Sequence, residues 1–230
     1  MEEIVEGFLE ALRLIASLDR ELVDISLRSI CVSGLALLLA SAWGIPIALC
    51  LSMAEFRGKA LLKRFFEALL GLPTTSLGLL LFLLFCREGP LGFLRLLYTP
   101  VAISLGQAIL ITPIVVCFAG RAIESVAPEI RELARTLGAS GAQEALAVLR
   151  EARVGMALAL IAAFNRAIAE LGVALMVGGN IRGWTRVLTT AIALETAKGD
   201  LPMAIALTLV LLALVAILNG LSRLVGRLAR

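Results

Sequence analysis

The chain has 230 residues, of which 60% are hydrophobic and only 17% are charged. Soluble domains average about 45–50% apolar and about 25% charged residues, so this composition indicates an integral membrane protein. The formal charge of +3 gives no reason to expect a nucleic-acid partner, and the lack of histidine excludes His-dependent catalysis, His metal sites and His proton relays.

Residues 1–20 form the first predicted element, an amphipathic helix. Ile4, Phe8 and Leu12 recur at helical spacing, with Glu and Arg residues on the other side. The segment is too charged to span a bilayer, so we expect a peripheral helix on the membrane surface. Glutamates stand where a cleavable signal peptide would carry Lys or Arg, so we expect no such signal.

Five apolar intervals follow, and each is long enough for a membrane-spanning helix, which needs about 20 residues. A polar connection from Asn180 to Asp200 separates the last two intervals. The connections are too short for a soluble domain, so we expect one all-α integral membrane domain over residues 1–230. The predicted spans are residues 27–53, 65–86, 96–120, 154–181 and 201–222.

The distribution of basic residues predicts the topology. Arg57, Lys59, Lys63 and Arg64 lie together after the first span, and the positive-inside rule assigns such a loop to the cytoplasm. The N-terminus is then outside and the C-terminus is cytoplasmic. In this topology 12 of the 21 Lys and Arg residues lie inside and eight lie outside, while Arg166 falls within a span.

The cytoplasmic segment 121–153, between the third and fourth spans, is the longest charged interval, with five Arg and five Glu. Pro128 suits the first turn of a helix, and Gly138 provides a left-handed stop. Ser140 and Gln143 have the spacing of a capping box for a second helix. The pattern predicts two helices around a glycine corner, either as an ordinary surface hairpin or as a docking element for a separate protein.

The order Glu132-Leu133-Ala134, with Gly138 six residues after the glutamate, resembles the EAA loop of permease subunits of ABC importers. Leu133 replaces an alanine of that motif, and Val148-Leu149-Arg150-Glu151 stands where the family has Ile-x-Leu-Pro. The resemblance implies that Glu132, Ala134, Gly138 and the adjacent Ala139 seat in a cleft of an ATPase subunit.

Further along, residues 164–172 and 176–181 resemble the oxyanion branch of these permeases, which carries sulfate, molybdate and tungstate. Residues 182–196 look most like tungstate permeases. The similarity covers nearly the whole chain. It implies a homodimeric permease in a prokaryotic plasma membrane, working with two ABC ATPase subunits and an extracytoplasmic oxyanion-binding protein.

This chain is not expected to be an enzyme. It lacks the G-x-x-x-x-G-K-[ST] sequence of a P-loop, so ATP hydrolysis must come from another subunit. No cofactor is expected. The four cysteines lack the C-x-x-C spacing of metal and redox sites, and we interpret them as small side chains that pack between helices. The alternatives are a molybdate or sulfate permease, a passive anion channel and, from another class, an intramembrane enzyme.

Polar residues within the spans are candidates for the translocation pathway. Arg166 and Glu170 are four residues apart, hence on one helix face, and each costs about 2.5–3.5 kcal/mol to insert into a membrane. They form either a structural ion pair or a site where Arg166 helps an anion to pass. Hydroxyl and amide side chains could also line a water-filled pathway, although hydroxyl groups often form hydrogen bonds to the backbone of their own helix. These are Thr74, Thr75, Ser76 and Gln107.

Overall fold

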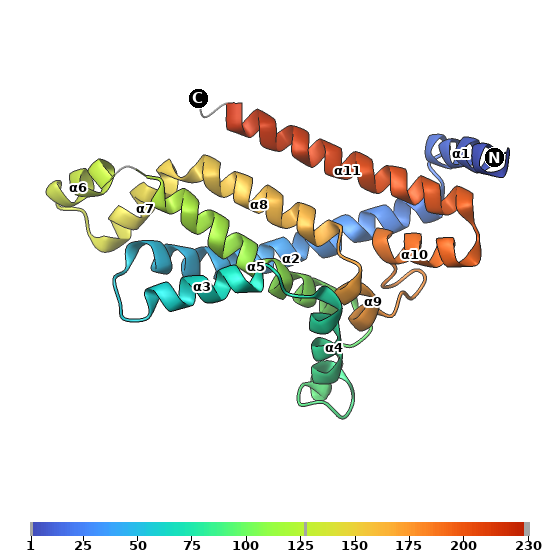
Figure 1. Cartoon of the computed structure of the whole chain (residues 1–230), viewed down its shortest axis with the longest axis horizontal. Coiled ribbons are helices and arrows are strands. Elements are labelled where there is room, and N and C mark those ends of the chain that lie inside the picture. The colour runs from blue at the N-terminus through green and yellow to red at the C-terminus, as the bar shows by residue number, and fades with distance from the viewer. Residues whose placement is uncertain (1, 127, 228–230) are drawn as a thin grey trace.

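The computed structural model describes residues 2–126 and 128–227, and all regular structure in these residues is helical. Long helices lie side by side along one axis, with α2 packed on α5, and α8 packed on both α5 and α11 (Figure 1). The elements are α1 (Glu2–Ala16), α2 (Arg20–Met53), α3 (Lys59–Leu69), α4 (Thr74–Phe85), the 3-10 turn η1 (Gly92–Leu94), α5 (Pro100–Glu124), α6 (Pro128–Thr136), α7 (Gly141–Glu151), α8 (Arg153–Ile168), α9 (Gly172–Gly178), α10 (Leu188–Lys198) and α11 (Leu201–Arg227).

Three helices, α2, α5 and α11, are long and apolar enough to cross a membrane as continuous spans. Two further helix pairs are long and apolar enough only when taken together, and both are bent: α3 and α4 meet at an angle of 101°, and α8 and α9 meet at 56°. The prediction of five spans is therefore met only if each bent pair counts as one. Residues 65–86 and 154–181 are each divided between two helices.

Local chemistry explains both breaks. Pro73 has no backbone N–H to donate and disfavours helical geometry in the residue before it, so α3 cannot continue through it into α4. At the second break the side chain of Glu170 accepts a hydrogen bond of 3.1 Å from the backbone N–H of Val173. The carboxylate thereby satisfies a donor in the first turn of α9, which favours a new helix start there.

The core lies where α2, α5 and α8 meet. Their contact is rich in fully buried alanines, which allow the helix backbones to approach closely. Ile111 and Val115 of α5 fill the space between them. The buried set is Ala36, Ala40, Ala108, Ile111, Val115, Ala163 and Ala167.

The N-terminal segment is helical as predicted. Helix α1 packs on α11, and Ala11 is fully buried in a cluster with Leu22 and Leu207. Phe8 and Leu12 remain exposed, so α1 still has apolar surface that would suit a membrane interface. Its position on the membrane surface stays a prediction.

Helix α10 was not expected, because residues 180–200 looked like a polar connection. Its first residue donates a backbone hydrogen bond of 2.7 Å to the Ser29 hydroxyl of α2, and Gly199 ends it with a φ of 81°. Thr189, Thr190 and Glu195 are buried on it. Polar residues therefore stabilise a helix that hydropathy alone cannot detect.

Candidate functional site

Segment 121–153 folds as the sequence predicts, into two short helices around a glycine corner. Gly138 has a φ of 76°, a left-handed conformation that glycine adopts at low cost. The backbone N–H of Ala139 donates to the carbonyl of Ala134 at 3.0 Å, which closes the end of α6. Ser140 and Gln143 form the predicted capping box at the start of α7. Figure 1 shows α6 and α7 at one end of the bundle, opposite α1 and α10.

The corner presents an apolar surface to its surroundings. Leu133 is 59% exposed and Leu137 is 78% exposed, while Glu132 is exposed beside them. Ala134 and Ala139 are half-buried. Large exposed leucines at a helix end are costly in water, so this surface suits contact with another protein.

One ion pair and one hydrogen bond to a backbone carbonyl hold the two helices in place. Arg135 of α6 donates from Nε to a carboxylate oxygen of the buried Glu144 of α7 at 3.0 Å. This hydrogen bond, together with the negative charge of Glu144, raises the pKa of Arg135. Arg131 donates from Nη2 to the carbonyl of Ile123 at 3.1 Å, which connects α6 to the end of α5. Helix α6 is therefore joined to α7 and to the end of α5 by specific contacts.

The two helix breaks lie against each other. A Cβ at Gly172 would lie 2.7 Å from the Thr74 hydroxyl and 3.1 Å from the Thr75 backbone nitrogen, so only glycine permits this approach. The starts of α4 and α9 are thus in contact. Thr75 and Ser76 are exposed there, and Pro73 offers no side-chain cap to the first turn of α4. Free N–H groups and hydroxyls at a helix N-terminus favour anions.

Arg166 and Glu170 form the ion pair that their spacing allows, with 2.6 Å between Nη1 and Oε2. The two partners differ in burial. Glu170 is 2% exposed and also accepts from Val173, whereas Arg166 is 37% exposed. The carboxylate is therefore part of the packed break between α8 and α9, and the guanidinium remains partly accessible next to it.

Gln107 lies apart from these groups, in the packed core. Its Nε2 donates to the carbonyl of Ala167 at 3.0 Å, and its Oε1 accepts from the Ser33 hydroxyl at 3.2 Å. Only 2% of the residue is exposed. The amide connects α5 to α8 and α2, and in this conformation it does not reach an open path.

We expect Gln107→Leu to lower the thermal stability of the protein. The change leaves the Ala167 carbonyl and the Ser33 hydroxyl without this partner, and an unsatisfied buried group costs about 1–3 kcal/mol. Ser33→Ala removes only one of the two bonds and serves as the matched control, with a smaller shift in Tm. Thermal unfolding followed by tryptophan fluorescence measures both. An unchanged Tm in Gln107→Leu would contradict this role.

Among the described residues, no group of three or more His, Cys, Asp and Glu side chains is arranged to hold a metal ion. The structure instead offers an exposed apolar corner at one end of the bundle, two helix breaks in contact, and helices that are long and apolar enough to cross a membrane.

Comparison with known proteins matches residues 40–230 to the family of binding-protein-dependent transport system inner membrane components. The chain belongs to this family. Such proteins are multi-pass permease components of the inner membrane and are not enzymes themselves. Membership implies that an ATPase and a substrate-binding protein work with this chain.

Relatives within the family include permeases of oxyanion transport systems. The tungstate uptake system permease of Peptoclostridium acidaminophilum is 38% identical over 220 residues, which is 96% of both chains. The corresponding protein of Campylobacter jejuni is 35% identical, with 95% of this chain and 92% of its own length covered. The molybdenum transport system permease of Escherichia coli is 30% identical over 76% of this chain and 80% of its own.

Proposed function

We propose that this chain is the permease subunit of an ATP-driven importer for a tetrahedral oxyanion, with tungstate as the transported species. The observation that carries this proposal is the near full-length similarity to two tungstate permeases, at 38% and 35% identity. The similarity to a molybdenum permease is weaker and covers less of the chain. Molybdate and sulfate are the alternative substrates within the same family.

The α6–α7 corner is the proposed contact with the ATPase. Leu133 and Leu137 provide exposed apolar side chains, and Glu132 adds a charge beside them. Gly138 and Ala139 set the turn that presents them. The position that departs from the family motif, Leu133, faces outward, so it would enlarge the apolar contact rather than disturb the packing of α6.

The transport path is proposed to pass the junction of the two helix breaks. Thr74, Thr75 and Ser76 lie at the start of α4, where helix geometry favours an anion. Arg166 contributes a positive charge that Glu170 moderates, so that a dianion is attracted without being trapped. Gln107 would support this region by fixing α5 against α2 and α8.

Two copies of the chain would form the complete path, because one bundle supplies half of a symmetric channel and a two-fold dimer is the commonest closed assembly. The N-terminus would lie outside and the α6–α7 corner in the cytoplasm, as the basic residues after α2 favour. Two ATPase subunits would move the corners together when they close on ATP. The bundles would then rotate as rigid bodies and change which side of the membrane the path faces.

Reconstituted transport tests this function. Proteoliposomes would contain the permease with its ATPase, with the binding protein and tungstate outside and ATP inside. We expect uptake that requires both ATP and the binding protein. Unlabelled tungstate should inhibit this uptake more strongly than molybdate or sulfate does. Oxyanion flux that is independent of ATP would show a passive channel and contradict the proposal.

A further inference from the structure

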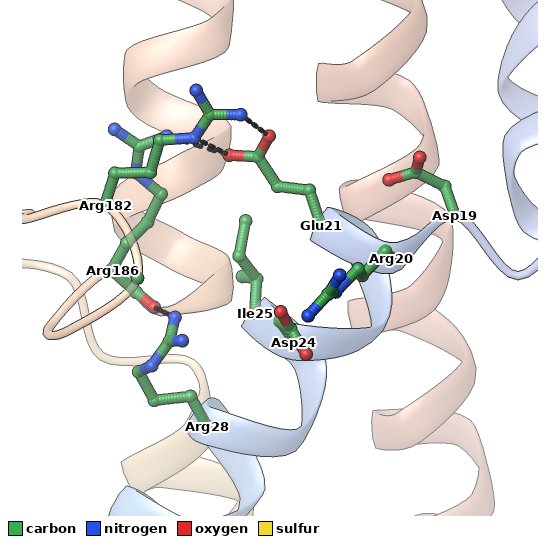
Figure 2. Close-up of a pocket in the computed structure, with 9 residues that line it drawn as sticks. Asp19, Arg20, Glu21, Asp24, Ile25, Arg28, Arg182 and Arg186 are labelled. Atoms are coloured by element: carbon green, nitrogen blue, oxygen red, sulfur yellow. Dashed lines mark hydrogen bonds and ion pairs between the residues drawn. The ribbon is translucent and has the colours of Figure 1, made fainter.

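A hollow at the end of the bundle opposite α6 and α7 has no role in the coupling corner or in the path proposed above. Its volume is about 370 Å³, and it lies between the first turns of α2 and the loop of residues 179–187 (Figure 2). Side chains of both elements face it, and arginines dominate them. They are Arg20, Arg28, Arg182 and Arg186.

Two of these arginines are already paired with carboxylates. Arg182 donates from Nε to Glu21 at 3.0 Å and forms a second hydrogen bond to the other oxygen of the same group. This bonding raises the pKa of Arg182. Arg186 places Nη1 3.3 Å from Glu21 and 3.6 Å from Glu195. The pairs connect the 179–187 loop to α2 and α10, which makes one wall of the hollow rigid.

The other two arginines have no carboxylate partner among the described residues. Arg28 donates from Nη1 to the carbonyl of Arg186 at 3.0 Å, and Arg20 is exposed at the rim. The carboxylate of Asp19 is occupied as the cap of α2, where it accepts from the N–H of Leu22. Among the described residues that line the hollow, Asp24 is then the only one whose carboxylate forms no hydrogen bond or ion pair.

The residues that line the hollow carry four guanidinium groups and three carboxylates, those of Asp19, Glu21 and Asp24, which gives a net charge of +1. A single additional carboxylate would balance this charge, whereas a doubly charged oxyanion would leave a negative excess. The hollow also retains an unsatisfied donor: only 9% of the Arg186 side chain is exposed, and its Nε is buried without a hydrogen-bond partner. Buried donors of this kind are rare in folded proteins.

We propose that this hollow receives an acidic side chain of the external binding protein. The assignment rests on the proposed function, since it requires such a partner at this end of the molecule. Guanidinium groups bind carboxylates through two parallel hydrogen bonds, which gives orientation as well as attraction. A charge contact at an exposed rim also accelerates association. The hollow would thus align the binding protein over the bundle.

The test uses the permease–ATPase complex in nanodiscs of phosphatidylcholine, which offers no anionic headgroup as a competing occupant. Affinity for the substrate-loaded binding protein is measured by biolayer interferometry at low and high salt. We expect Arg20→Glu to weaken binding about tenfold or more and to reduce its salt dependence. A glutamate in the first turn of α2 suits the helix dipole, so the variant should fold.

Arg87→Glu is the matched control, because Arg87 is an exposed arginine of the loop between α4 and α5, outside the hollow. We expect it to bind nearly as tightly as the unchanged complex. Restoration of Arg20→Glu binding by an Asp→Arg or Glu→Arg change in the binding protein would support the assignment.

Equal losses in Arg20→Glu and Arg87→Glu, or no loss in either, would overturn the assignment while leaving the importer function intact. Saturable binding of tungstate to the complex alone, abolished by Arg20→Glu, would identify a small-anion site and overturn it as well. A complex that binds no binding protein in its unchanged form would instead remove the proposed function and the assignment together.

Discussion

Replacing Gly138 with valine is expected to uncouple ATP hydrolysis from uptake. The left-handed φ of 76° costs a non-glycine residue about 1–2 kcal/mol, which corresponds to roughly a tenfold change in the population of the corner. No atom lies within 4 Å of the position where a Cβ would be, so the penalty is backbone strain and not a clash in the core. The permease should insert and dimerise, while uptake per ATP hydrolysed falls about tenfold.

Gly141→Val is the matched control for this experiment. Gly141 lies three residues away in the same segment, also has open space around it, and does not have a positive φ. Uptake and phosphate release are measured together in proteoliposomes. Normal coupling in Gly138→Val, or equal uncoupling in both variants, would contradict the docking role of the corner.

Replacing Arg166 with alanine should reduce both stability and transport. The change leaves the Glu170 side chain 2% exposed and without its cationic partner. Removal of one member of a fully buried pair costs about 3–5 kcal/mol, and the cost here should be smaller because Arg166 is partly exposed. We expect a lower Tm and uptake reduced by roughly tenfold or more, measured as initial rates of oxyanion import.

The double variant Arg166→Ala with Glu170→Gln separates the structural role from transport. Glutamine removes the negative charge but keeps an oxygen that accepts from the Val173 N–H. Stability should therefore recover while uptake stays low, since the path still lacks its cation. Full recovery of uptake in the double variant would show that the pair is only structural and that Arg166 is not part of the path.

Features set by local chemistry could be predicted from the sequence. Gly138 and the Ser140–Gln143 cap define a turn within a few residues, and the structure confirms both. The apolar intervals of α2, α5 and α11 likewise identify spans, because hydropathy reports directly on transfer into a bilayer.

Features that depend on contacts between distant segments could not be predicted. The junction of the two helix breaks depends on the packing of Gly172 against Thr74, which are far apart in the sequence. Gln107 looked equally suitable for a wet path, and only the fold shows its amide bonded across three helices. The arginine hollow combines residues more than 150 positions apart, as in the bond from Arg28 to Arg186.

The most direct test of the central claim, that the α6–α7 corner contacts the ATPase, is site-specific photo-crosslinking. A benzophenone amino acid replaces Leu137 at the corner or, as a control, Phe93 in the loop between α4 and α5; both side chains are highly exposed. The permease is then irradiated in membranes that contain the ATPase. We predict a covalent adduct with the ATPase from position 137 and none from position 93. No adduct from position 137, or adducts of equal yield from both positions, would contradict the account.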